Sequence, residues 1–566
     1  METRSYLKHW GAEYVATDTV RFRLWATGQN KVKLRLSGKE TDMQPTGNGW
    51  FEQLVSGVLP GAEYQFVLAD GMTVPDPASR AQRDDVDGPS LVIDPTAYVW
   101  QNTQWSGRRW EETVVYELHI GTFTPQGTFQ AAAEKLPYLA ELGITMIEVL
   151  PVAQFGGRRG WGYDGVLLYA PHAAYGTPDD FKAFIDAAHG YGISVVLDIV
   201  LNHFGPQGNY LPLLSPDFFH PERMTPWGAG IAHDVEAVRQ YIAEAPLYWL
   251  REFNLDGLRF DAIDQIEDTT DPHILIEIAQ RIRAELPERP IHLTTEDCRN
   301  VIFLHPRDAD GNAPRLTVNG MRALTEGFVY QGEVAVQSGE ARGVDSRGQP
   351  PAAFFDFLQN HDQVGNRAQG DRLITLTGAD RNKVLLATLL LSPHIPLLLM
   401  GEEYGETNPF LFFTDFHGDL ARAVREGRAR EFEGHAGHEG EVVPDPNAET
   451  TFTRSKLDWH KPDSAEGKAW LALTRQLLTL RQNVIVPLLG TAGGHAGQVL
   501  KTAPGFVAVS WTFPRGQLSI ALNIGATTQP CPPARQKDLH STPSWFVFCQ
   551  ERKNDHSNRH MAYSVS

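Results

Sequence analysis

From residue 113 onward the chain alternates short apolar runs with segments of helical spacing, and this alternation limits the possible folds more than any other feature. The apolar runs predict strands at 114–118, 144–150, 193–200, 255–260, 291–295, 353–358 and 396–400. Between them, residues 129–142 and 181–188 carry apolar side chains at helical spacing. Strands and helices that alternate over such a length form a parallel sheet, either a (β/α)8 barrel or a doubly wound sheet.

Segments rich in short strands lie on both sides of this region. Residues 13–70 and 499–524 alternate apolar and polar side chains in short runs, which is typical of antiparallel sheets. A chain of 566 residues is also too long for a single core. We therefore predict an immunoglobulin-like N-terminal β-sandwich over 1–95, a linker over 96–112, a central (β/α)8 TIM barrel over 113–485 and a C-terminal antiparallel β-domain over 486–566. Strand alternation is lost after about residue 528, so the last domain is expected to be irregular there and incomplete.

The charge of the chain excludes some classes of partner. Asp and Glu number 69 against 50 Lys and Arg, a formal net charge of −19. Such a balance disfavours nucleic acid and anionic membranes as partners. The longest apolar stretch, 384–400, contains two prolines, so it predicts a helix followed by a strand rather than a membrane span.

The three cysteines, Cys298, Cys531 and Cys549, are sparse and lack the spacing of metal ligands. Sparse cysteines suit a reducing compartment. The first ten residues contain no apolar segment typical of a signal peptide. We expect a cytoplasmic protein with no metal site.

Acidic residues stand where five of the predicted strands end: Asp198, Asp261, Glu296, Asp362 and Glu402. One such carboxylate could be a helix N-cap, but five on five separate strands are harder to explain by capping. Barrels build their active sites at the carboxyl ends of the strands. A doubly wound sheet usually carries a Gly-rich phosphate loop, and this sequence has none. The pattern favours a barrel with a carboxylate-rich site.

The segment 257–261, Gly-Leu-Arg-Phe-Asp, gives the sharpest local inference. Because side chains alternate along a strand, Arg259 and Asp261 point to the same face. An arginine beside an aspartate favours the ionised carboxylate that a nucleophile needs, although the two could instead form a structural ion pair. Glu296 ends an apolar strand, where desolvation would raise its pKa for acid catalysis.

Three carboxylates, Asp261, Glu296 and Asp362, without a Cys/His cluster, favour glycosyl chemistry. One would be a nucleophile, one a general acid/base, and one would stabilise the charged sugar ring. The candidates for binding sugar rings and hydroxyls are Trp161, Tyr163, His203, His361 and Glu402. Each of the aromatic residues and histidines, taken singly, could equally be part of a packed core.

Four ordered segments of the chain resemble the sequence motifs of the α-amylase superfamily. They are Asp-Ile-Val-Leu-Asn-His at 198–203, Gly-Leu-Arg-Phe-Asp-Ala at 257–262, the strand that ends at Glu296, and Asn-His-Asp at 360–362. The resemblance covers about 114–459. It implies that Asp261 is the nucleophile, Glu296 the general acid/base and Asp362 the transition-state stabiliser.

The same resemblance assigns binding roles. It implies that Arg259, His203 and His361 line the subsite of the cleaved sugar, that Tyr163 stacks on the sugar ring, and that Asp198 supports the site.

Within that superfamily the chain resembles the maltooligosyltrehalose trehalohydrolase family. The resemblance rests on the segments 116–125, 155–164, 409–415 and 452–459. It implies retaining hydrolysis, without a cofactor, of the α-1,4 bond between trehalose and a malto-oligosaccharide. The implied partners are maltooligosyltrehalose and related α-glucans. The aromatic segments 161–163 and 410–413 are then candidates for stacking on sugars, although 410–413 could instead be a buried connector.

Two alternatives remain open. A 1,4-α-glucan branching enzyme would share the sandwich, the barrel and nearly the same motifs. A non-catalytic malto-oligosaccharide-binding relative is the other alternative, because this chain lacks the Trp-Asn-Asp-Asp-Phe-His block that the family usually carries after the acid/base residue.

Overall fold

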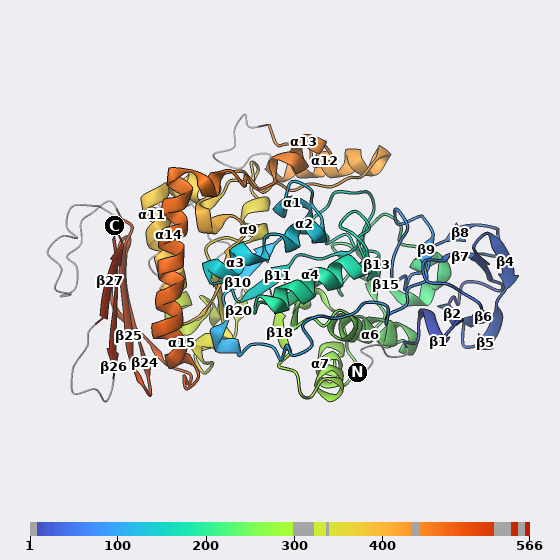
Figure 1. Cartoon of the computed structure of the whole chain (residues 1–566), viewed down its shortest axis with the longest axis horizontal. Coiled ribbons are helices and arrows are strands. Elements are labelled where there is room, and N and C mark those ends of the chain that lie inside the picture. Colours follow the sequence, from blue (N-terminus) through green and yellow to red (C-terminus); the bar gives the residue numbers. More distant parts are fainter. Residues whose placement is uncertain are drawn as a thin grey trace.

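The computed structural model describes residues 8–297, 322–334, 339–432, 442–525, 545–552 and 561–565. Three regions follow one another along the long axis in Figure 1: N-terminal strands at the right, a central mass of strands and helices, and a C-terminal sheet at the left. The predicted fold class, a barrel sheet flanked by β-rich regions, is confirmed. The predicted residue boundaries between the domains stay predictions.

The N-terminal region is a sandwich of two antiparallel sheets. One sheet has the order β1 (Gly11–Ala16), β2 (Thr19–Trp25), β6 (Trp50–Ser56), β5 (Gln44–Gly47). The other has the order β4 (Lys39–Asp42), β3 (Lys33–Leu36), β7 (Glu63–Val67), β8 (Thr73–Val74), and β9 (Ser90–Leu91) also pairs with β7. Alternate residues of β2 and β7, among them Phe22 and Phe66, are fully buried and form a core between the sheets.

The central region is built on a sheet of seven described parallel strands, with the order β18-β17-β14-β11-β10-β22-β21. These are β10 (Val115–Leu118), β11 (Met146–Val149), β14 (Ser194–Ile199), β17 (Gly257–Phe260), β18 (His292–Thr295), β21 (Phe355–Phe357) and β22 (Ile395–Leu399). Neighbours in the sheet follow the chain from β10 to β18, and β22 closes back onto β10. This is the strand order of a (β/α)8 barrel.

One further strand would lie between β18 and β21 in such a barrel. Residues 298–321 connect these two strands, together with a short helix at 322–326 and the hairpin β19 (Gln331–Val334), β20 (Ala341–Gly343). The block that the sequence lacks falls in this connection, of which residues 298–321 and 335–338 lie outside the described residues.

Helices cover the outer face of the barrel sheet. The first predicted helix, 129–142, is in fact two: α2 (Phe129–Ala133) and α3 (Leu136–Leu142). Pro137 stands in the first turn of α3, and a proline cannot continue a preceding helix because it lacks an N–H and restricts the residue before it. Further helices are α1 (Ile120–Phe123), α4 (Pro178–Gly190), α5 (Leu211–Leu214), α6 (Glu236–Glu252), α7 (Ile274–Glu285), α9 (His361–Gly365), α10 (Leu373–Thr377), α11 (Ala379–Leu391), α12 (Gly418–Phe432), α13 (Glu449–Arg454), α14 (Ala465–Leu480) and α15 (Val486–Leu489).

The segment predicted as a linker runs along the barrel surface. The buried carboxylate of Asp186, on α4, accepts hydrogen bonds from the Tyr98 hydroxyl at 3.0 Å and from the backbone N–H groups of Gln101 and Asn102 at 2.7 and 2.9 Å. These contacts hold the segment against one helix of the barrel.

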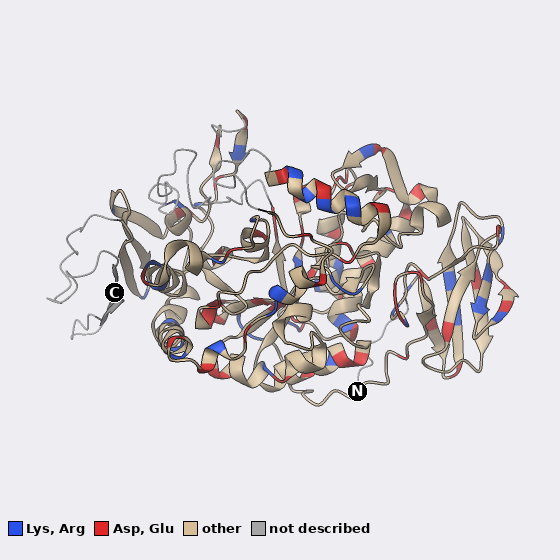
Figure 2. Cartoon of the chain, turned by 90° about the horizontal axis from the view of Figure 1, so that it is seen from above, with Lys and Arg blue, Asp and Glu red and all other residues tan. Residues whose placement is uncertain are grey.

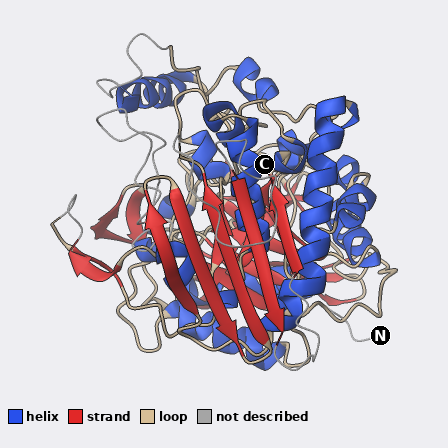
Figure 3. Cartoon of the chain, turned by 90° about the vertical axis from the view of Figure 1, so that its left-hand side faces the viewer, coloured by secondary structure: helices blue, strands red, loops and turns tan. Residues whose placement is uncertain are grey.

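The C-terminal region corrects one expectation. Five antiparallel strands form its sheet: β23 (Gly497–Ala503), β24 (Phe506–Phe513), β25 (Gly516–Asn523), β26 (Trp545–Arg552) and β27 (Met561–Val565). Figure 3 shows this sheet face-on. The expected loss of strands after about residue 528 is therefore wrong for β26 and β27. The run Trp-Phe-Val-Phe at 545–548 pairs with β25 along its length, and Phe546 and Phe548 are buried.

The outer surface carries charges of both signs. In the view of Figure 2, Lys and Arg are mixed with Asp and Glu along the outer helices and the N-terminal strands. Within the described ranges, no helix is both long enough and apolar enough to cross a membrane. No group of three metal-ligating side chains was found in that part of the chain either.

Trp10 joins the N-terminal sandwich to the barrel. Its fully buried ring meets Trp50 of the sandwich and Tyr241 of α6 edge-to-face, with both centroids 5.1 Å away. The indole N–H donates to the carbonyl of Ala237, also on α6, at 3.1 Å. One side chain therefore fills the space between two regions that each have a core of their own.

We expect Trp10→Ala to lower the free energy of unfolding by about 3–5 kcal/mol, because it leaves a cavity and removes a buried hydrogen bond. Urea unfolding monitored by circular dichroism measures this loss. The control is Val15→Ala, at a position 45% exposed on the same sandwich, which should change stability by less than about 0.5 kcal/mol. Equal stability of the two variants would contradict the role given to Trp10.

Candidate active site

One arginine side chain lies at the centre of the predicted site. Arg259, on β17, is 8% exposed. Its guanidinium donates to Asp198 at 2.7 Å, to Asp261 at 2.8 Å and to Glu296 at 2.8 Å. Asp198 stands beside Arg259 in the register of β14 and β17, and Glu296 follows directly after β18. The parallel register thus brings three predicted carboxylates to one buried cation.

The Asp261 carboxylate lies two residues beyond Arg259 on the same face, as the strand period predicts. Burial raises the pKa of Asp261 to about 6, and the neighbouring carboxylates of Asp198 and Asp362 add to the rise while Arg259 opposes it. The sequence predicted that Arg259 would favour the ionised form. Arg259 does so, but the net shift is upward because burial outweighs it. Asp261 is still ionised at neutral pH.

The Glu296 carboxylate is held by two donors. Its Oε2 accepts from the Arg259 guanidinium and, at 3.2 Å, from the backbone N–H of Ala262. Ala262 has φ 40°, a left-handed conformation that is strained for a residue with a Cβ, and this turn directs its N–H toward Glu296. Burial raises the pKa of Glu296, with further contributions from Asp261 and Asp362.

His361 and Tyr163 form the second half of the site. The Tyr163 ring stacks on the His361 ring with centroids 5.2 Å apart. The Tyr163 hydroxyl donates to Asp198 Oδ2 at 2.7 Å and lies 2.7 Å from His361 Nε2. Asp362 lies 3.6 Å from the same nitrogen. Asn360 caps α9 by accepting from the Gln363 N–H at 2.8 Å, so the first turn of this helix carries His361 and Asp362 into the site.

His203 lines the other side of Tyr163. Its Nε2 pairs with the carbonyl of Tyr163 at 2.9 Å and its Nδ1 with the side chain of Asn202 at 2.9 Å. Burial lowers the pKa of His203 to about 4, so the ring is neutral at physiological pH.

Two of the predicted binding residues make hydrogen bonds to the backbone of neighbouring segments. Trp161 is buried, donates to the carbonyl of Leu411 at 3.0 Å and meets the His361 ring edge-on. Glu402 is also buried and accepts from the Leu399 N–H at 3.1 Å. The run 410–413 agrees with the buried-connector interpretation, because Phe410 and Phe413 are fully buried and Phe410 stacks on Trp161.

Sequence reasoning missed two residues. Trp227, between β15 (Phe219–Thr225) and β16 (Gly228–Ile231), is 47% exposed and stacks on His203 with centroids 4.4 Å apart. A single Trp in a polar turn gives no periodic signal. Glu117 is buried on β10 and binds His361. Its only signal was a charged residue within an otherwise apolar strand.

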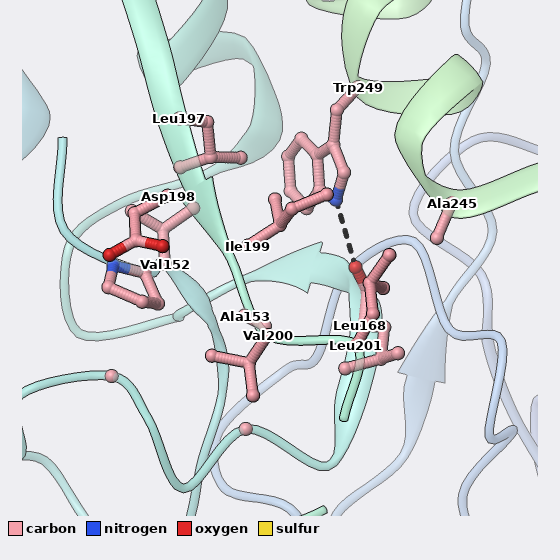
Figure 4. A pocket seen from close by; sticks show the side chains of 13 residues that line it. Val152, Ala153, Leu168, Leu197, Asp198, Ile199, Val200, Leu201, Ala245 and Trp249 are labelled. Atoms are coloured by element: carbon pink, nitrogen blue, oxygen red, sulfur yellow. Dashed lines mark hydrogen bonds between the residues drawn. The ribbon is translucent and has the colours of Figure 1, made fainter. Parts of the chain in front are cut away.

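A small cavity lies against β14. Its lining is mainly apolar and includes Leu197, Ile199 and Trp249, whose indole donates to the carbonyl of Leu168 (Figure 4). The Asp198 side chain points to the other side of β14 from Trp249. Asp198 is nevertheless among the residues that line the cavity, so the cavity borders the carboxylate site.

Comparisons with known proteins identify the family of the chain. The family model of the alpha amylase catalytic domain matches residues 82–212. The malto-oligosyltrehalose trehalohydrolase of Deinococcus radiodurans is 41% identical, over 85% of this chain and 84% of its own. That of Saccharolobus solfataricus is 38% identical, over 82% and 85%. The chain belongs to the malto-oligosyltrehalose trehalohydrolase family.

Structural similarity leads to the same superfamily. The crystal structure of a protein assigned as an alpha amylase from Salmonella typhimurium has a TM-score of 0.89 and 68% sequence identity, over 95% of this chain and 98% of that one. A branching enzyme of Streptomyces avermitilis matches 43% of this chain at 34% identity. Membership of the trehalohydrolase family makes the chain a glycoside hydrolase, and the branching-enzyme alternative has only this partial match.

We expect Arg259→Lys to lower kcat/KM on a glycoside substrate by at least about 100-fold, because an ammonium cannot donate in a planar fork to carboxylates from three strands. Initial-rate kinetics measure the loss, and circular dichroism checks that the variant folds. Arg109→Lys is the control, since Arg109 is 73% exposed and pairs with Glu112 at the surface. Wild-type kinetics for Arg259→Lys would contradict the central role of the guanidinium.

Proposed function

We propose that the chain hydrolyses the α-1,4 bond between trehalose and a malto-oligosaccharide, with net retention at the anomeric carbon. The observation that carries the proposal is the single guanidinium of Arg259 that binds both Asp261 and Glu296 through adjacent nitrogens. A shared planar cation supports the short separation, about 5 Å, that two carboxyl groups need in a retaining mechanism. Relatives named for this trehalohydrolase activity support the choice of substrate.

In the first step a carboxylate oxygen of Asp261 attacks the anomeric carbon of the glucose bonded to trehalose. The bond from this carbon to the trehalose O4 breaks as Glu296 transfers its proton to that oxygen. Free trehalose leaves, and the malto-oligosaccharide stays bonded to Asp261 as an ester.

In the second step Glu296, now ionised, takes a proton from water as the water oxygen attacks the same anomeric carbon. The bond to Asp261 breaks, the malto-oligosaccharide departs with its original configuration, and both carboxyl groups return to their starting states. Protein side chains carry every proton and charge in this cycle.

Burial raises the pKa of both carboxyl groups, to about 6 for Asp261 and above its usual value for Glu296, and Arg259 opposes the rise at each. A raised pKa suits a proton donor, and Asp261 is still ionised at neutral pH. The side chains of Asp261 and Glu296 remain 12% and 21% exposed, so a substrate can reach both. Arg259 balances the charge that moves between them.

We assign substrate binding to the residues around this pair. Asp362 would face the positive charge that develops on the sugar ring, and Tyr163, His361, His203 and Asp198 would bind the ring and its hydroxyls. The half-exposed indole of Trp227, fixed by stacking on His203, offers a further flat apolar surface for a sugar. The sparse cysteines support a cytoplasmic location for the enzyme.

The proposal is tested by giving the protein maltotriosyltrehalose and, separately, maltotriose and amylose. We expect trehalose and maltotriose from the first substrate, with α-maltotriose as the first anomer seen by proton NMR. Maltotriose should be cleaved at least about 100-fold less efficiently, because it lacks the trehalose part whose binding lowers the barrier.

The other outcomes discriminate among the alternatives. β-Maltotriose as the first product would contradict retention, and new α-1,6 branches on amylose would identify a branching enzyme. Binding of maltotriosyltrehalose without release of sugar would favour a non-catalytic binding protein.

A further inference from the structure

We propose that Glu117, on β10, is a positioning residue of this site that holds His361 as a doubly protonated imidazolium in one orientation. This inference rests on the proposed function, because it concerns how the same sugar-binding site keeps its shape and charge. Glu117 itself does not face the substrate.

Glu117 and His361 are both buried and are joined by two hydrogen bonds. Glu117 and His361 are each 2% exposed. One carboxylate oxygen of Glu117 lies 2.6 Å from His361 Nδ1, and the other accepts from the His361 backbone N–H at 3.0 Å. A single carboxylate therefore fixes the ring and also the first turn of α9, which carries Asp362.

The hydrogen-bond geometry around the ring fits two ring protons. In the proposed arrangement the Tyr163 hydroxyl donates its one proton to Asp198 Oδ2, 2.7 Å away. The hydroxyl oxygen then accepts from His361 Nε2, also 2.7 Å away, so Nε2 carries a proton. Since Nδ1 faces the Glu117 carboxylate, it too is a donor, and a histidine that donates from both nitrogens is an imidazolium.

Charged and titratable groups face His361 from several elements. They are Glu117 on β10, Glu148 on β11, Asp198 on β14, Arg259 on β17, Asp362 on α9, Tyr163 and His119. Burial alone would lower the pKa of His361, but the carboxylates of Asp362 and Glu117 outweigh it and raise that pKa to about 10. Glu117 makes the shorter of these two contacts, 2.6 Å against 3.6 Å for Asp362.

The neighbouring glutamate, Glu148, provides a matched control for Glu117. Glu148 stands beside Glu117 in the register of β10 and β11 and is 7% exposed. Burial, with the charge of Glu117, raises the pKa of Glu148 to about 8. Of the two glutamates, Glu117 makes the hydrogen bonds to His361. The two glutamates are matched in type, depth and strand position but differ in contact.

Loss of the Glu117 charge should change the proton pattern of the site. Without it, the ring gives up a proton nearer neutral pH, and Nε2 becomes an acceptor. The Tyr163 hydroxyl then turns toward Nε2 and leaves Asp198. Because the working state has a protonated His361, activity is lost as the pH rises through the pKa of His361. Without the Glu117 charge that pKa is lower, so activity is lost at a lower pH.

The test compares full-length Glu117→Gln and Glu148→Gln with the wild type, using maltotriosyltrehalose from pH 5 to 10. For Glu117→Gln we expect kcat to fall at least about 100-fold, as for other carboxylates that orient a histidine. The high-pH side of the pH–rate profile, its alkaline limb, should move down by about two pH units in Glu117→Gln. Glu148→Gln should keep kcat at pH 7 within about threefold and should move the alkaline limb by clearly less than Glu117→Gln does, because Glu117 makes the hydrogen bonds to His361. An unmoved alkaline limb in Glu117→Gln, or equal losses in the two variants, would overturn the proposal.

A second arm measures the proton pattern directly and needs no turnover. Wild-type protein labelled with ¹³C/¹⁵N-histidine is followed by NMR, with the His361 signals assigned by their absence in His361→Asn. We expect both ring nitrogens to stay protonated up to about pH 8.5. A neutral ring at pH 7 would overturn the proposal whether or not Glu117→Gln folds. Protonated His361 in a protein without turnover would instead contradict the proposed function alone.

Discussion

The interaction on which this site depends is the buried ion pairing of Arg259 with Asp198, Asp261 and Glu296. Ionised carboxylates are costly to bury without a partner. A single guanidinium with several donors can serve carboxylates from three neighbouring strands, which a lysine cannot. The parallel register sets Asp198 beside Arg259 at the carboxyl ends of the strands. The proposed nucleophile and acid/base are held by the same cation.

A second cation completes the charge balance. His361 carries its charge on the opposite side of Tyr163 from Arg259, and Tyr163 connects the two through Asp198. The site therefore holds its dipoles and charges in place before a substrate arrives, which is how a buried site stabilises a developing oxocarbenium ion at small reorganisation cost. The raised pKa values of Asp261 and Glu296 follow from the same burial. The fold holds groups here that are desolvated or strained, and the backbone of Ala262, in the left-handed conformation, is one of them.

Periodic features were predictable from the sequence and aperiodic ones were not. The strand period alone predicted that Arg259 and Asp261 share a face, and acidic residues at strand ends predicted the site. The backbone partners of buried side chains were not predictable: Trp161 and Glu402 bond to the backbone of Leu411 and Leu399, and their role at the substrate stays a prediction. Glu117 and Trp227 act through partners far away in sequence, which a local pattern cannot reveal. The strands β26 and β27 were missed because the sequence from about residue 529 loses the alternation of apolar and polar residues.

The central claim is that Asp261 forms the covalent intermediate, and trapping that intermediate tests it most directly. A 5-fluoro-α-glucosyl fluoride reacts with the nucleophile of a retaining α-glycosidase but releases slowly, so the ester accumulates. After peptic digestion and mass spectrometry, we expect the sugar on the peptide that contains Asp261, and no labelled peptide from Asp261→Asn. A stable label on Glu296 or Asp362, or steady turnover of natural substrate by Asp261→Asn, would contradict the account.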